Sequence, residues 1–292
     1  IKIIKYLSEK EIDRLKEKYR ISVYFKVKRQ IKIFFFGLLK FFLNTNPILK
    51  SRSLEEVKNK YENISGTYIK SYLSKNRSFY ADIDGKQVVE LKGGLETYYT
   101  EHISNIIKKK KISSFLEVGA GEMTLMYDLL KKIKNKKIKP MGALDIAFQR
   151  LEKGKKFLKK RKISLDYIVK GDAANIPFAD NSFDLIYTSH CLEQVPHLFN
   201  DILKECIRVS KKYVVLIEPS YEFGSSVTKD HIYKKGYPKI SNKLFKQENY
   251  KIIFRKGLPI KSYINGSEII VLKKQKNKKK TKKKYYKFQN CK

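Results

Sequence analysis

The sequence predicts an α/β protein in which helices cover both faces of a mainly parallel, doubly wound sheet. From residue 112 onward, short apolar stretches alternate with longer amphipathic ones, which is the pattern of such sheets. A glycine-rich turn, Gly119-Ala120-Gly121, follows the first apolar stretch, and acids close the next two, at Asp145 and Asp172. Because a parallel sheet collects the carboxyl ends of its strands at one edge, these residues predict a ligand site there.

Seven strands and four helices are expected after residue 112. The strands are expected at 112–118, 140–145, 165–170, 183–189, 213–218, 250–255 and 268–273, and the helices at 123–134, 147–162, 198–210 and 239–248. No helical stretch separates the last two strands. The turn residues Gly257-Leu258-Pro259 and Asn265-Gly266 indicate a reversing connection, which would make the last strand antiparallel.

The first hundred residues are predicted to form a helical extension. Two segments match the capping-box pattern, beginning at Ser8 and Ser53, each with a glutamate three residues later. The tyrosine-rich residues 61–100 are expected to form a helical cap over the sheet edge, with turns at Asp84-Gly85 and Gly93-Gly94. The expected organisation is therefore a helical extension over 1–100, a ligand-binding domain over 101–274 and a disordered polybasic tail over 275–292.

Segment 21–43 has the composition of a basic amphipathic helix. At helical spacing, phenylalanine and leucine fall on one face and basic residues near the other, which suits an interfacial membrane anchor. A helix packed on the domain or on a partner subunit has the same pattern. The apolar run 31–43 is shorter than the roughly 20 residues that a spanning helix needs. The lysine-rich tail is either solvated or attracted to anionic lipid or RNA.

The formal net charge is +36, with 65 lysines and arginines against 29 acids. Such a charge would ordinarily suggest nucleic acid or an anionic membrane as a partner. Lysine, however, greatly outnumbers arginine, and isoleucine, asparagine, tyrosine and phenylalanine are frequent, which is typical of an AT-rich genome. A dedicated nucleic-acid surface favours arginine, so nucleic acid is the less favoured partner.

Three cysteines, Cys191, Cys206 and Cys291, lie far apart and form no CxxC pair. They predict neither a metal site nor a disulfide framework, which fits a reducing compartment. No stretch has the pattern of a signal peptide. These patterns predict a cytoplasmic protein, with a peripheral position on the inner face of a membrane if segment 21–43 is an anchor. The sequence begins with Ile1, so targeting residues upstream of it stay an open question.

Four positions at expected strand ends carry the chemistry. Glu117 precedes the glycine turn by two residues, and glycines let a backbone approach a ligand closely. Asp145, at the end of the second strand, suits hydrogen bonds to both hydroxyls of a ribose. Asp172 is followed by small residues and suits an adenine amino group. Residues 181–190 form a strand that opens with Phe-Asp and ends in Ser189-His190.

In these motifs the region 110–275 resembles the class I S-adenosylmethionine-dependent methyltransferases, in particular the group similar to the quinone-biosynthesis methyltransferases. The matching motifs are Leu116–Gly121, Leu144-Asp145, Gly171–Phe178, Asn181–Asp184 and Ser189–His197. A dinucleotide-binding fingerprint would need a glycine at position 124, which is Thr124 here. Many relatives have a third glycine in place of Met123 and a histidine in place of Gln194. The change to Met123 should be tolerated if its side chain packs on the cofactor, and the change to Gln194 weakens any proposal for a base at that position.

The resemblance implies a Rossmann-like fold and S-adenosyl-L-methionine as the cofactor. By the family pattern, Gly119 and Gly121 pass the methionine moiety and Glu117 orders their loop. Asp145 binds the ribose, Asp172 and Ala173 flank the adenine, and Ser189 and His190 sit beside the methyl group. The cofactor contacts that this implies are Glu117, Gly119, Ala120, Gly121, Asp145, Ile146, Asp172, Ala173, Ser189 and His190.

Methyl transfer from a sulfonium is an in-line displacement, so the protein mainly aligns the nucleophile, the methyl carbon and the sulfur. An oxygen or nitrogen nucleophile also has to lose a proton, and His190 is the leading candidate for the general base. An equally good interpretation is that His190 only hydrogen-bonds backbone near the cofactor. Glu193, Glu218 and Tyr221 are expected to contact the acceptor, and the segment 223–241 to shape its pocket.

Three classes of function fit these motifs. An enzyme that methylates an oxygen or nitrogen of a small-molecule, lipid or glycan acceptor is favoured, without a metal. The alternative is an RNA-directed methyltransferase, or a basic RNA-binding adaptor that retains the cofactor fold. The sequence lacks the Asn/Asp-Pro-Pro-Tyr/Phe signature of amino-group methylation on bases or glutamine, which argues against those particular targets. The third class is a non-enzymatic, membrane-associated partner in a biosynthetic complex. The acceptor, the pathway and the oligomeric state stay open.

Overall fold

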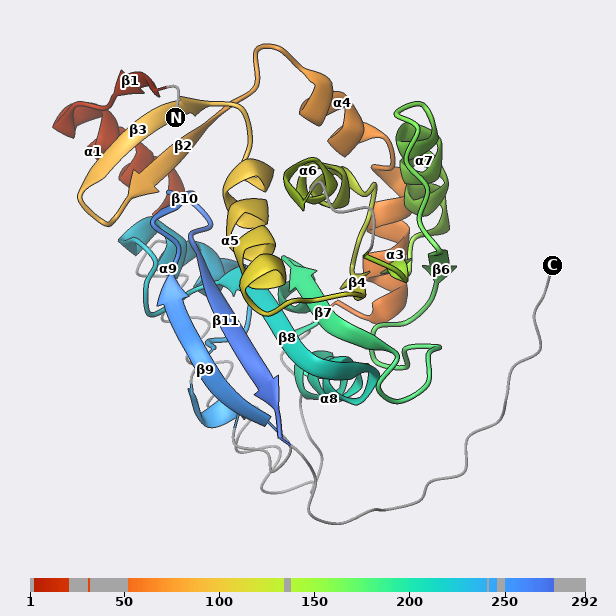
Figure 1. Ribbon diagram of the computed structural model, residues 1–292. Coiled ribbons are helices and arrows are strands. Elements are labelled where there is room, and N and C mark those ends of the chain that lie inside the picture. Colours follow the sequence, from red (N-terminus) through yellow and green to blue (C-terminus); the bar gives the residue numbers. More distant parts are fainter. Residues whose placement is uncertain are drawn as a thin grey trace.

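A computed structural model describes residues 3–20, 31, 52–133, 138–240, 242–245 and 250–275. Apart from Ile31, segment 21–43 lies outside the described residues, and so does the tail from residue 276 onward. The described residues form a large sheet flanked by helices and a second, smaller sheet at one end of it (Figure 1). None of the described helices is long and apolar enough to cross a membrane.

The large sheet has seven strands in the order β6-β5-β4-β7-β8-β11-β9. Its strands are β4 (Phe115–Val118), β5 (Met141–Asp145), β6 (Tyr167–Lys170), β7 (Phe183–Ser189), β8 (Ser210–Pro219), β9 (Tyr250–Gly257) and β11 (Ser267–Lys274). β11 runs antiparallel to both β8 and β9, and the remaining pairs are parallel. The predicted fold class and the antiparallel last strand are confirmed.

The chain changes its direction of progress across the sheet at β4. β5 and β6 lie on one side of β4, whereas β7 and β8 lie on the other. Open α/β sheets bind ligands at such a reversal, outside the carboxyl ends of the strands. The glycine turn after β4 and the loop after β7 are both at this point.

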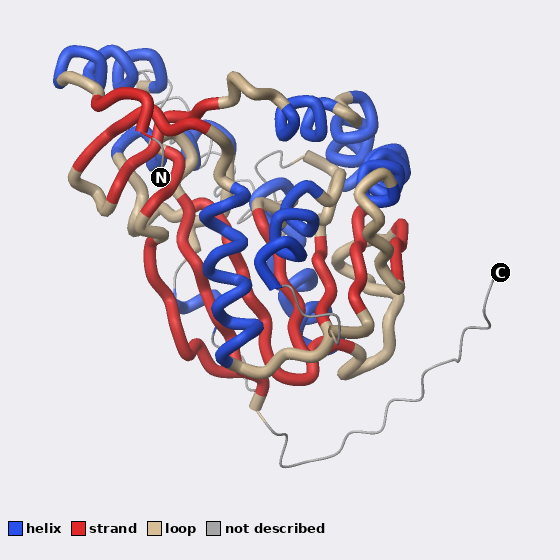
Figure 2. Tube along the Cα trace, turned by 45° about the horizontal axis from the view of Figure 1, so that its top comes forward, coloured by secondary structure: helices blue, strands red, loops and turns tan. Residues whose placement is uncertain are grey.

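Helices cover both faces of the large sheet (Figure 2). One face carries α5 (Glu96–Lys109), α6 (Thr124–Ile133) and α7 (Phe148–Lys159), and the other carries α8 (Phe199–Val209). Because side chains alternate along a strand, Leu185 packs with the first group of helices and Ile186 packs with α8. The two apolar cores built in this way hold the strand ends in fixed positions.

Three of the four helices expected in this region are present, as α6, α7 and α8. Of the helix expected at 239–248, the described residues contain only a short 3-10 helix, η3 (Asn242–Phe245). The segment 223–241 contains α9 (Ser226–Lys235), whose N-cap is Ser225 and which ends at Gly236 in the left-handed conformation.

The N-terminal hundred residues are not wholly helical, contrary to expectation. Both capping boxes are present, in α1 (Glu9–Tyr19) and α3 (Leu54–Asn63), and α4 (Thr67–Leu73) follows. A four-stranded antiparallel sheet is then formed by β1 (Ile3–Tyr6), β3 (Gln87–Lys92), β2 (Ser78–Ile83) and β10 (Ile260–Ser262), in that order.

The predicted turn at Asp84-Gly85 explains this difference. Both residues have positive φ, 52° and 74°, which is the geometry of a tight hairpin turn rather than of a connection between helices. Val89 and Leu91 of β3 are buried and alternate with less buried residues, as in a strand with one face in a core, and Ala81 of β2 packs in the same core. The turn was recognised in the sequence, but the period-two pattern beside it was not.

Two buried or half-buried glutamates attach the N-terminal helices to the large domain. Glu122, next to the glycine turn, accepts hydrogen bonds from the backbone N–H of Gly66 at 2.8 Å and of Ile69 at 2.7 Å. Glu62, in α3, accepts from the N–H of Phe148 at 2.7 Å and of Gln149 at 2.9 Å. Each carboxylate satisfies N–H groups at the first turn of a helix on the other side. The two pairs position α3 and α4 beside the carboxyl edge of the sheet.

Candidate functional site

A cavity of about 480 Å³ lies at the carboxyl edge of the large sheet. The turn after β4, the ends of β5 and β7 and the loop after β6 form its floor, while α3, α4 and α5 contribute side chains from the N-terminal part of the chain. The predicted cofactor contacts that line it are Glu117, Gly119, Ala120, Asp145, Ile146, Asp172, Ala173, Ser189 and His190. Gly121 alone of that set does not.

The glycine turn is held against the neighbouring strand and loop. The N–H groups of Gly119 and Ala120 both donate to the carbonyl oxygen of Leu144, at 2.8 and 3.0 Å. Gly119 has a φ of 76°, and a Cβ there would come within 2.6 Å of Cys191 Sγ. A side chain at this position is therefore excluded both by conformation and by space.

Asp145 presents a fixed carboxylate at the end of β5. Its Oδ2 accepts from the N–H of Gly121 and its Oδ1 from the N–H of Ala147, each at 2.8 Å. Because each carboxylate oxygen has two lone pairs, one acceptor site on each oxygen is still available for a ligand hydroxyl. Burial raises the pKa of Asp145. This geometry fits the two hydroxyls of a ribose.

Glu117 is a buried acid with a single neutral partner. Its Oε2 accepts from the Tyr187 hydroxyl at 3.1 Å, and it forms no ion pair within the described part of the chain. Burial raises the pKa of Glu117 to about 8, with nearby Asp145 acting in the same direction. A buried carboxylate on the wall of a cavity is stabilised by a cationic ligand, and S-adenosyl-L-methionine carries both a sulfonium and an ammonium group. The residues present therefore fit this cofactor.

Arg150 was not identified from the sequence, although it lines the cavity. Its guanidinium lies over the rings of Tyr61 and Tyr68, with 4.9 and 4.5 Å between the guanidinium carbon and the ring centroids. Its Nε is buried without a hydrogen-bond partner, 3.7 Å from a carboxylate oxygen of Glu122. The two tyrosines come from the N-terminal extension, so Arg150 joins that extension to the cavity.

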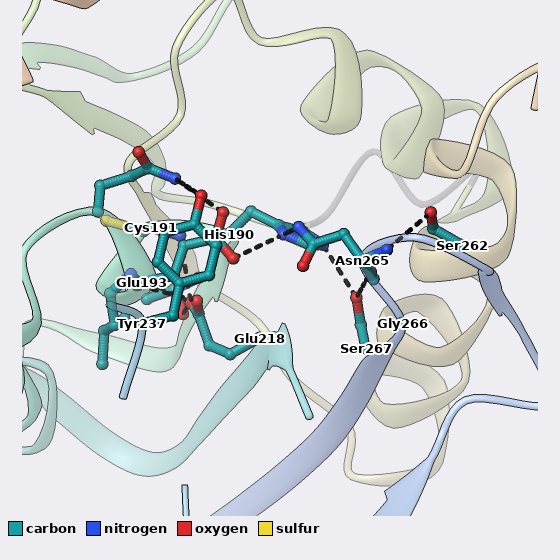
Figure 3. Close-up of polar contacts among 12 residues, drawn as sticks. His190, Cys191, Glu193, Glu218, Tyr237, Ser262, Asn265, Gly266 and Ser267 are labelled. Atoms are coloured by element: carbon teal, nitrogen blue, oxygen red, sulfur yellow. Dashed lines mark hydrogen bonds and ion pairs between the residues drawn. The ribbon is translucent and has the colours of Figure 1, made fainter. Parts of the chain in front are cut away.

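His190 is the centre of a hydrogen-bond network at the other end of the cavity (Figure 3). Its Nδ1 lies 3.1 Å from Glu193 Oε2, and its Nε2 lies 3.0 Å from both the Tyr99 hydroxyl and Ser267 Oγ. Asn265 Nδ2 is 3.3 Å from Nδ1. In the view of Figure 3, Glu193 and the Asn265–Ser267 segment lie on opposite sides of the His190 ring.

The surrounding contacts affect both the backbone conformation and the protonation of His190. Its φ is 53°, in the left-handed region that non-glycine residues rarely adopt. Burial by itself lowers the pKa of His190, but the neighbouring Tyr99 and Glu193 outweigh this effect and hold the pKa well above its ordinary value. The imidazole therefore favours its protonated form between these partners.

Glu218 and Tyr221, which we expected to contact the acceptor, lie outside the cavity lining. Glu218 is fully buried and accepts from the Thr188 hydroxyl and from the backbone N–H groups of Cys191, Leu192 and Glu193, at 3.1 to 3.3 Å. It therefore shapes the loop that holds His190 and Glu193, including η1 (Leu192–Gln194) and the adjoining η2 (Pro196–Leu198). Tyr221 instead lies beneath the ammonium group of Lys239, 4.3 Å from its ring centroid.

Met123 does not line the cavity either. It is fully buried in the core formed with α5 and α6, and its φ is 57°. The condition under which the change to Met123 was expected to be tolerated, packing on the cofactor, is therefore not met. Its side chain fills the core behind the glycine turn instead.

The strand order, the glycine turn and the acids at successive strand ends are those of the class I S-adenosylmethionine-dependent methyltransferases, a class whose cofactor is S-adenosyl-L-methionine. Residues 116–217 match the family model described as a methyltransferase domain.

Among curated proteins, the chain is similar to demethylmenaquinone methyltransferases. The protein of Staphylococcus epidermidis is 32% identical over 124 residues, which are 42% of this chain and 49% of that protein. The protein of Geobacillus sp. (strain WCH70) is 37% identical over 79 residues, which are 26% of this chain and 33% of that protein. The chain thus spans a third to a half of the length of these relatives.

Among solved structures, the [4+2]-cyclase SpnF has a TM-score of 0.58 at 11% identity, covering 77% of this chain and 97% of that one. A putative sarcosine dimethylglycine methyltransferase from Galdieria sulphuraria has a TM-score of 0.52 at 11% identity, covering 73% and 98%. At this identity the likeness shows the fold alone.

Proposed function

We propose that the protein transfers the methyl group of S-adenosyl-L-methionine to an oxygen or nitrogen of a small-molecule, lipid or glycan acceptor. The observation that carries the proposal is that one cavity connects the glycine turn and Asp145 with His190 and its partners. The bound cofactor supplies a methyl group on a good leaving group. The protein has to hold the two reactants in line and to manage the proton of the nucleophile.

The floor of the cavity supplies the contacts for the cofactor. Asp145 binds the ribose hydroxyls through its two free acceptor sites, and Gly119 leaves room for close approach of the backbone. Glu117 balances the positive charge of the methionine end. Asp172 and Ala173 flank the adenine, and the N–H of Ala174 fixes the Asp172 carboxylate through a 2.8 Å hydrogen bond.

His190 manages the proton. When neutral, the imidazole can accept the proton of the nucleophile at Nε2, the nitrogen that faces Tyr99 and Ser267, while Glu193 holds the other nitrogen. Tyr99 and Ser267 occupy the position from which an acceptor hydroxyl or amine would approach Nε2. An acceptor that reaches Nε2 therefore either replaces the hydrogen bonds of Tyr99 and Ser267 to this nitrogen or forms hydrogen bonds with these two side chains.

The curated relatives are named for a quinone acceptor, and a quinone is one small molecule to test. The decisive experiment incubates the full-length protein and labelled S-adenosyl-L-methionine with the membrane, soluble and RNA fractions of a host extract. We expect label in a small molecule, lipid or glycan. Label in RNA would replace the proposal by the RNA-directed alternative. Normal cofactor binding without label in any fraction would favour a non-enzymatic partner.

We further propose that the protein is cytoplasmic and binds the inner face of a membrane peripherally through segment 21–43 and the lysine-rich tail. The support is the amphipathic pattern and the positive charge of these segments. Full-length protein should co-sediment with anionic liposomes and lose this binding when 21–43 is deleted. No sedimentation of the intact protein, or equal sedimentation of the deletion variant, would refute the anchor.

A further inference from the structure

Two cations converge on one neutral oxygen at the rim of the cavity. Arg52, just before α3, and Lys60, within it, lie 3.3 and 3.5 Å from the side-chain oxygen of Gln194, measured from Nη1 and Nζ. Gln194 is only 8% exposed, and both Lys60 and Gln194 line the cavity. An amide oxygen carries only a partial negative charge, so it does not neutralise two cations.

The orientation of the Gln194 amide follows from its other contact. Its Nε2 donates to Glu193 Oε1 at 2.7 Å, which requires the amide nitrogen to face Glu193 and the amide oxygen to face the two cations. The Tyr237 hydroxyl lies 3.5 Å from the same nitrogen, and Arg52 is near enough to oppose the rise that burial causes in the pKa of Tyr237. The rim therefore holds a neutral hydroxyl donor beside the two cations.

Among the described residues, Glu193 is the carboxylate that raises the pKa of Lys60, and its effect is smaller than that of burial, of Arg52 or of Lys235, each of which lowers it. Within the described part of the chain, neither Arg52 nor Lys60 forms an ion pair, whereas Arg77, another cation on the cavity wall, is paired with Glu96 at 2.9 Å. Burial lowers the pKa of Lys60, and the nearby cations Arg52 and Lys235 lower it further. Cations held close together at a partly buried site favour the binding of an anion.

We propose that Arg52 and Lys60 bind a phosphate group of the methyl acceptor at the rim of the cavity. This inference rests on the proposed function, because it names the class of acceptor that the same cavity takes. The guanidinium of Arg52 offers a planar pair of N–H donors, and Lys60 offers a mobile point charge. The Tyr237 hydroxyl adds a further donor, and the nearby Lys235 adds positive charge. These donors and charges suit a tetrahedral dianion such as phosphate, whereas a carboxylate has a single charge and only two oxygens.

The rim is connected to the proposed catalytic centre by side chains in direct contact. From the two cations the contacts run through Gln194 to Glu193, and from Glu193 to His190 at 3.1 Å. A phosphate anchored at Arg52 and Lys60 would therefore sit two side chains away from the imidazole. The group to be methylated would extend inward from this anchor, toward His190 and Tyr99.

The test measures binding of inorganic phosphate to the full-length protein by phosphorus NMR titration and calorimetry. The variants are Arg52→Gln and Lys60→Met, and the matched control is Lys58→Met, which removes the same charge from the same helix but from a lysine paired with Glu55 at 3.0 Å. We expect saturable binding by the wild type that weakens at least about tenfold in either rim variant and is unchanged in the control. Acetate should bind more weakly than phosphate. Dimethyl phosphate represents a phosphodiester, and its binding is compared with that of inorganic phosphate, which represents a monoester.

Several outcomes would overturn the proposal. These are the absence of saturable phosphate binding, an equal loss in Lys58→Met, and binding of acetate as tight as that of phosphate. A loss of S-adenosyl-L-methionine affinity in Arg52→Gln and Lys60→Met would assign the two cations to the cofactor instead. Tighter binding of phosphate than of dimethyl phosphate supports a monoester acceptor, and equal binding supports a diester. Because none of these measurements needs turnover, a negative result leaves the methyltransferase proposal intact.

Discussion

Nδ1 of His190 lies 3.1 Å from the carboxylate oxygen Oε2 of Glu193, three residues further along the same loop. The loop is held in this shape by the buried Glu218, which accepts from three consecutive backbone N–H groups. His190 itself adopts a φ of 53°, a conformation that persists only where the surrounding contacts enforce it. The loop conformation thus fixes the contact between His190 and Glu193, and this contact favours the protonated form of His190.

The pH dependence of turnover tests whether His190 is a base. A base has to be neutral, and the pKa of His190 is held well above its ordinary value, so kcat/KM should rise with pH along a limb that lies above about 6.5. Glu193→Gln removes a carboxylate that raises this pKa, so the rising limb should move to lower pH. His190→Asn should lower kcat about 10²–10⁴-fold.

The control for this experiment is His102→Gln, which changes a half-buried histidine on α5 outside the cavity lining. It should leave both the rate and the pH profile unchanged. If Glu193→Gln lowers the rate without moving the rising limb, then His190 positions the acceptor and does not accept its proton.

The Tyr99 hydroxyl offers a second test of the same centre. It lies 3.0 Å from His190 Nε2 and 3.1 Å from Ser267 Oγ, and Tyr99→Phe removes both hydrogen bonds while retaining the ring. We expect kcat/KM to fall about tenfold, or about 1.4 kcal/mol, with unchanged affinity for the cofactor by calorimetry. Tyr98→Phe, the neighbouring tyrosine that does not line the cavity, is the matched control. Equal rates for Tyr99→Phe and Tyr98→Phe would remove Tyr99 from the site.

The sequence predicted the floor of the site better than its walls. Glu117, Gly119 and Asp145 each lie at a strand end next to a local motif, so a short stretch of sequence was enough to place them. Tyr99 and Ser267 are 91 and 77 residues away from His190, and only the packing of α5 and β11 brings them to it. No local pattern distinguishes Tyr99 from the other tyrosines around it.

The strands of the N-terminal part were harder to predict from the sequence, because they too depend on contacts between distant segments. Its two capping boxes are local hydrogen-bond patterns and were recognised correctly. The strands β2 and β3 are stabilised by each other and by β10, which lies far along the chain. The position of Arg52 and Lys60 at the cavity likewise depends on glutamate contacts between distant segments. Such long-range contacts have no signature in a single stretch of sequence.

Glu117 should make the stability of the cofactor-free protein depend on pH. Its pKa is about 8 in the folded protein and about 4.5 when exposed, so the folded state holds a proton that the unfolded state has lost between these values. The free energy of unfolding should therefore fall as pH rises from about 4.5 to about 8, by at most about 1.4 kcal/mol per pH unit from this group.

Glu117→Gln cannot ionise and keeps an oxygen that accepts from Tyr187, so it should lack this fall. Chemical denaturation at several pH values, with Glu9→Gln on the exposed face of α1 as the control, measures the difference between the slopes. A slope in Glu117→Gln that equals the slopes of the wild type and of Glu9→Gln would contradict the assignment.

Met123→Gly tests how the turn tolerates a bulky residue in place of glycine. The left-handed φ of 57° costs a non-glycine residue about 1–2 kcal/mol, which glycine would relieve. Removing a fully buried methionine side chain costs about 2–5 kcal/mol, which is more. The variant should therefore unfold at a lower temperature. Lys162→Gly, at an exposed residue with a φ of 59°, relieves the same strain without a cavity and should not destabilise the protein. Stabilisation by Met123→Gly would show that strain outweighs packing.

Asp145→Asn tests the assignment of the ribose contact. The carboxylate fixes the N–H of Gly121 with one oxygen and the N–H of Ala147 with the other, and the amide of asparagine has only one oxygen to offer. The affinity for S-adenosyl-L-methionine should fall at least tenfold, or about 1.4 kcal/mol, by calorimetry. The matched control is Asp166→Asn: Asp166 accepts from the N–H of Met141 at 2.8 Å, at the opposite end of β5 from Asp145. The amide oxygen of asparagine can keep this single hydrogen bond, so the variant removes a carboxylate from the other end of β5 and should leave cofactor affinity unchanged. If both variants bind the cofactor equally well, or both weaken equally, Asp145 does not contact the ribose.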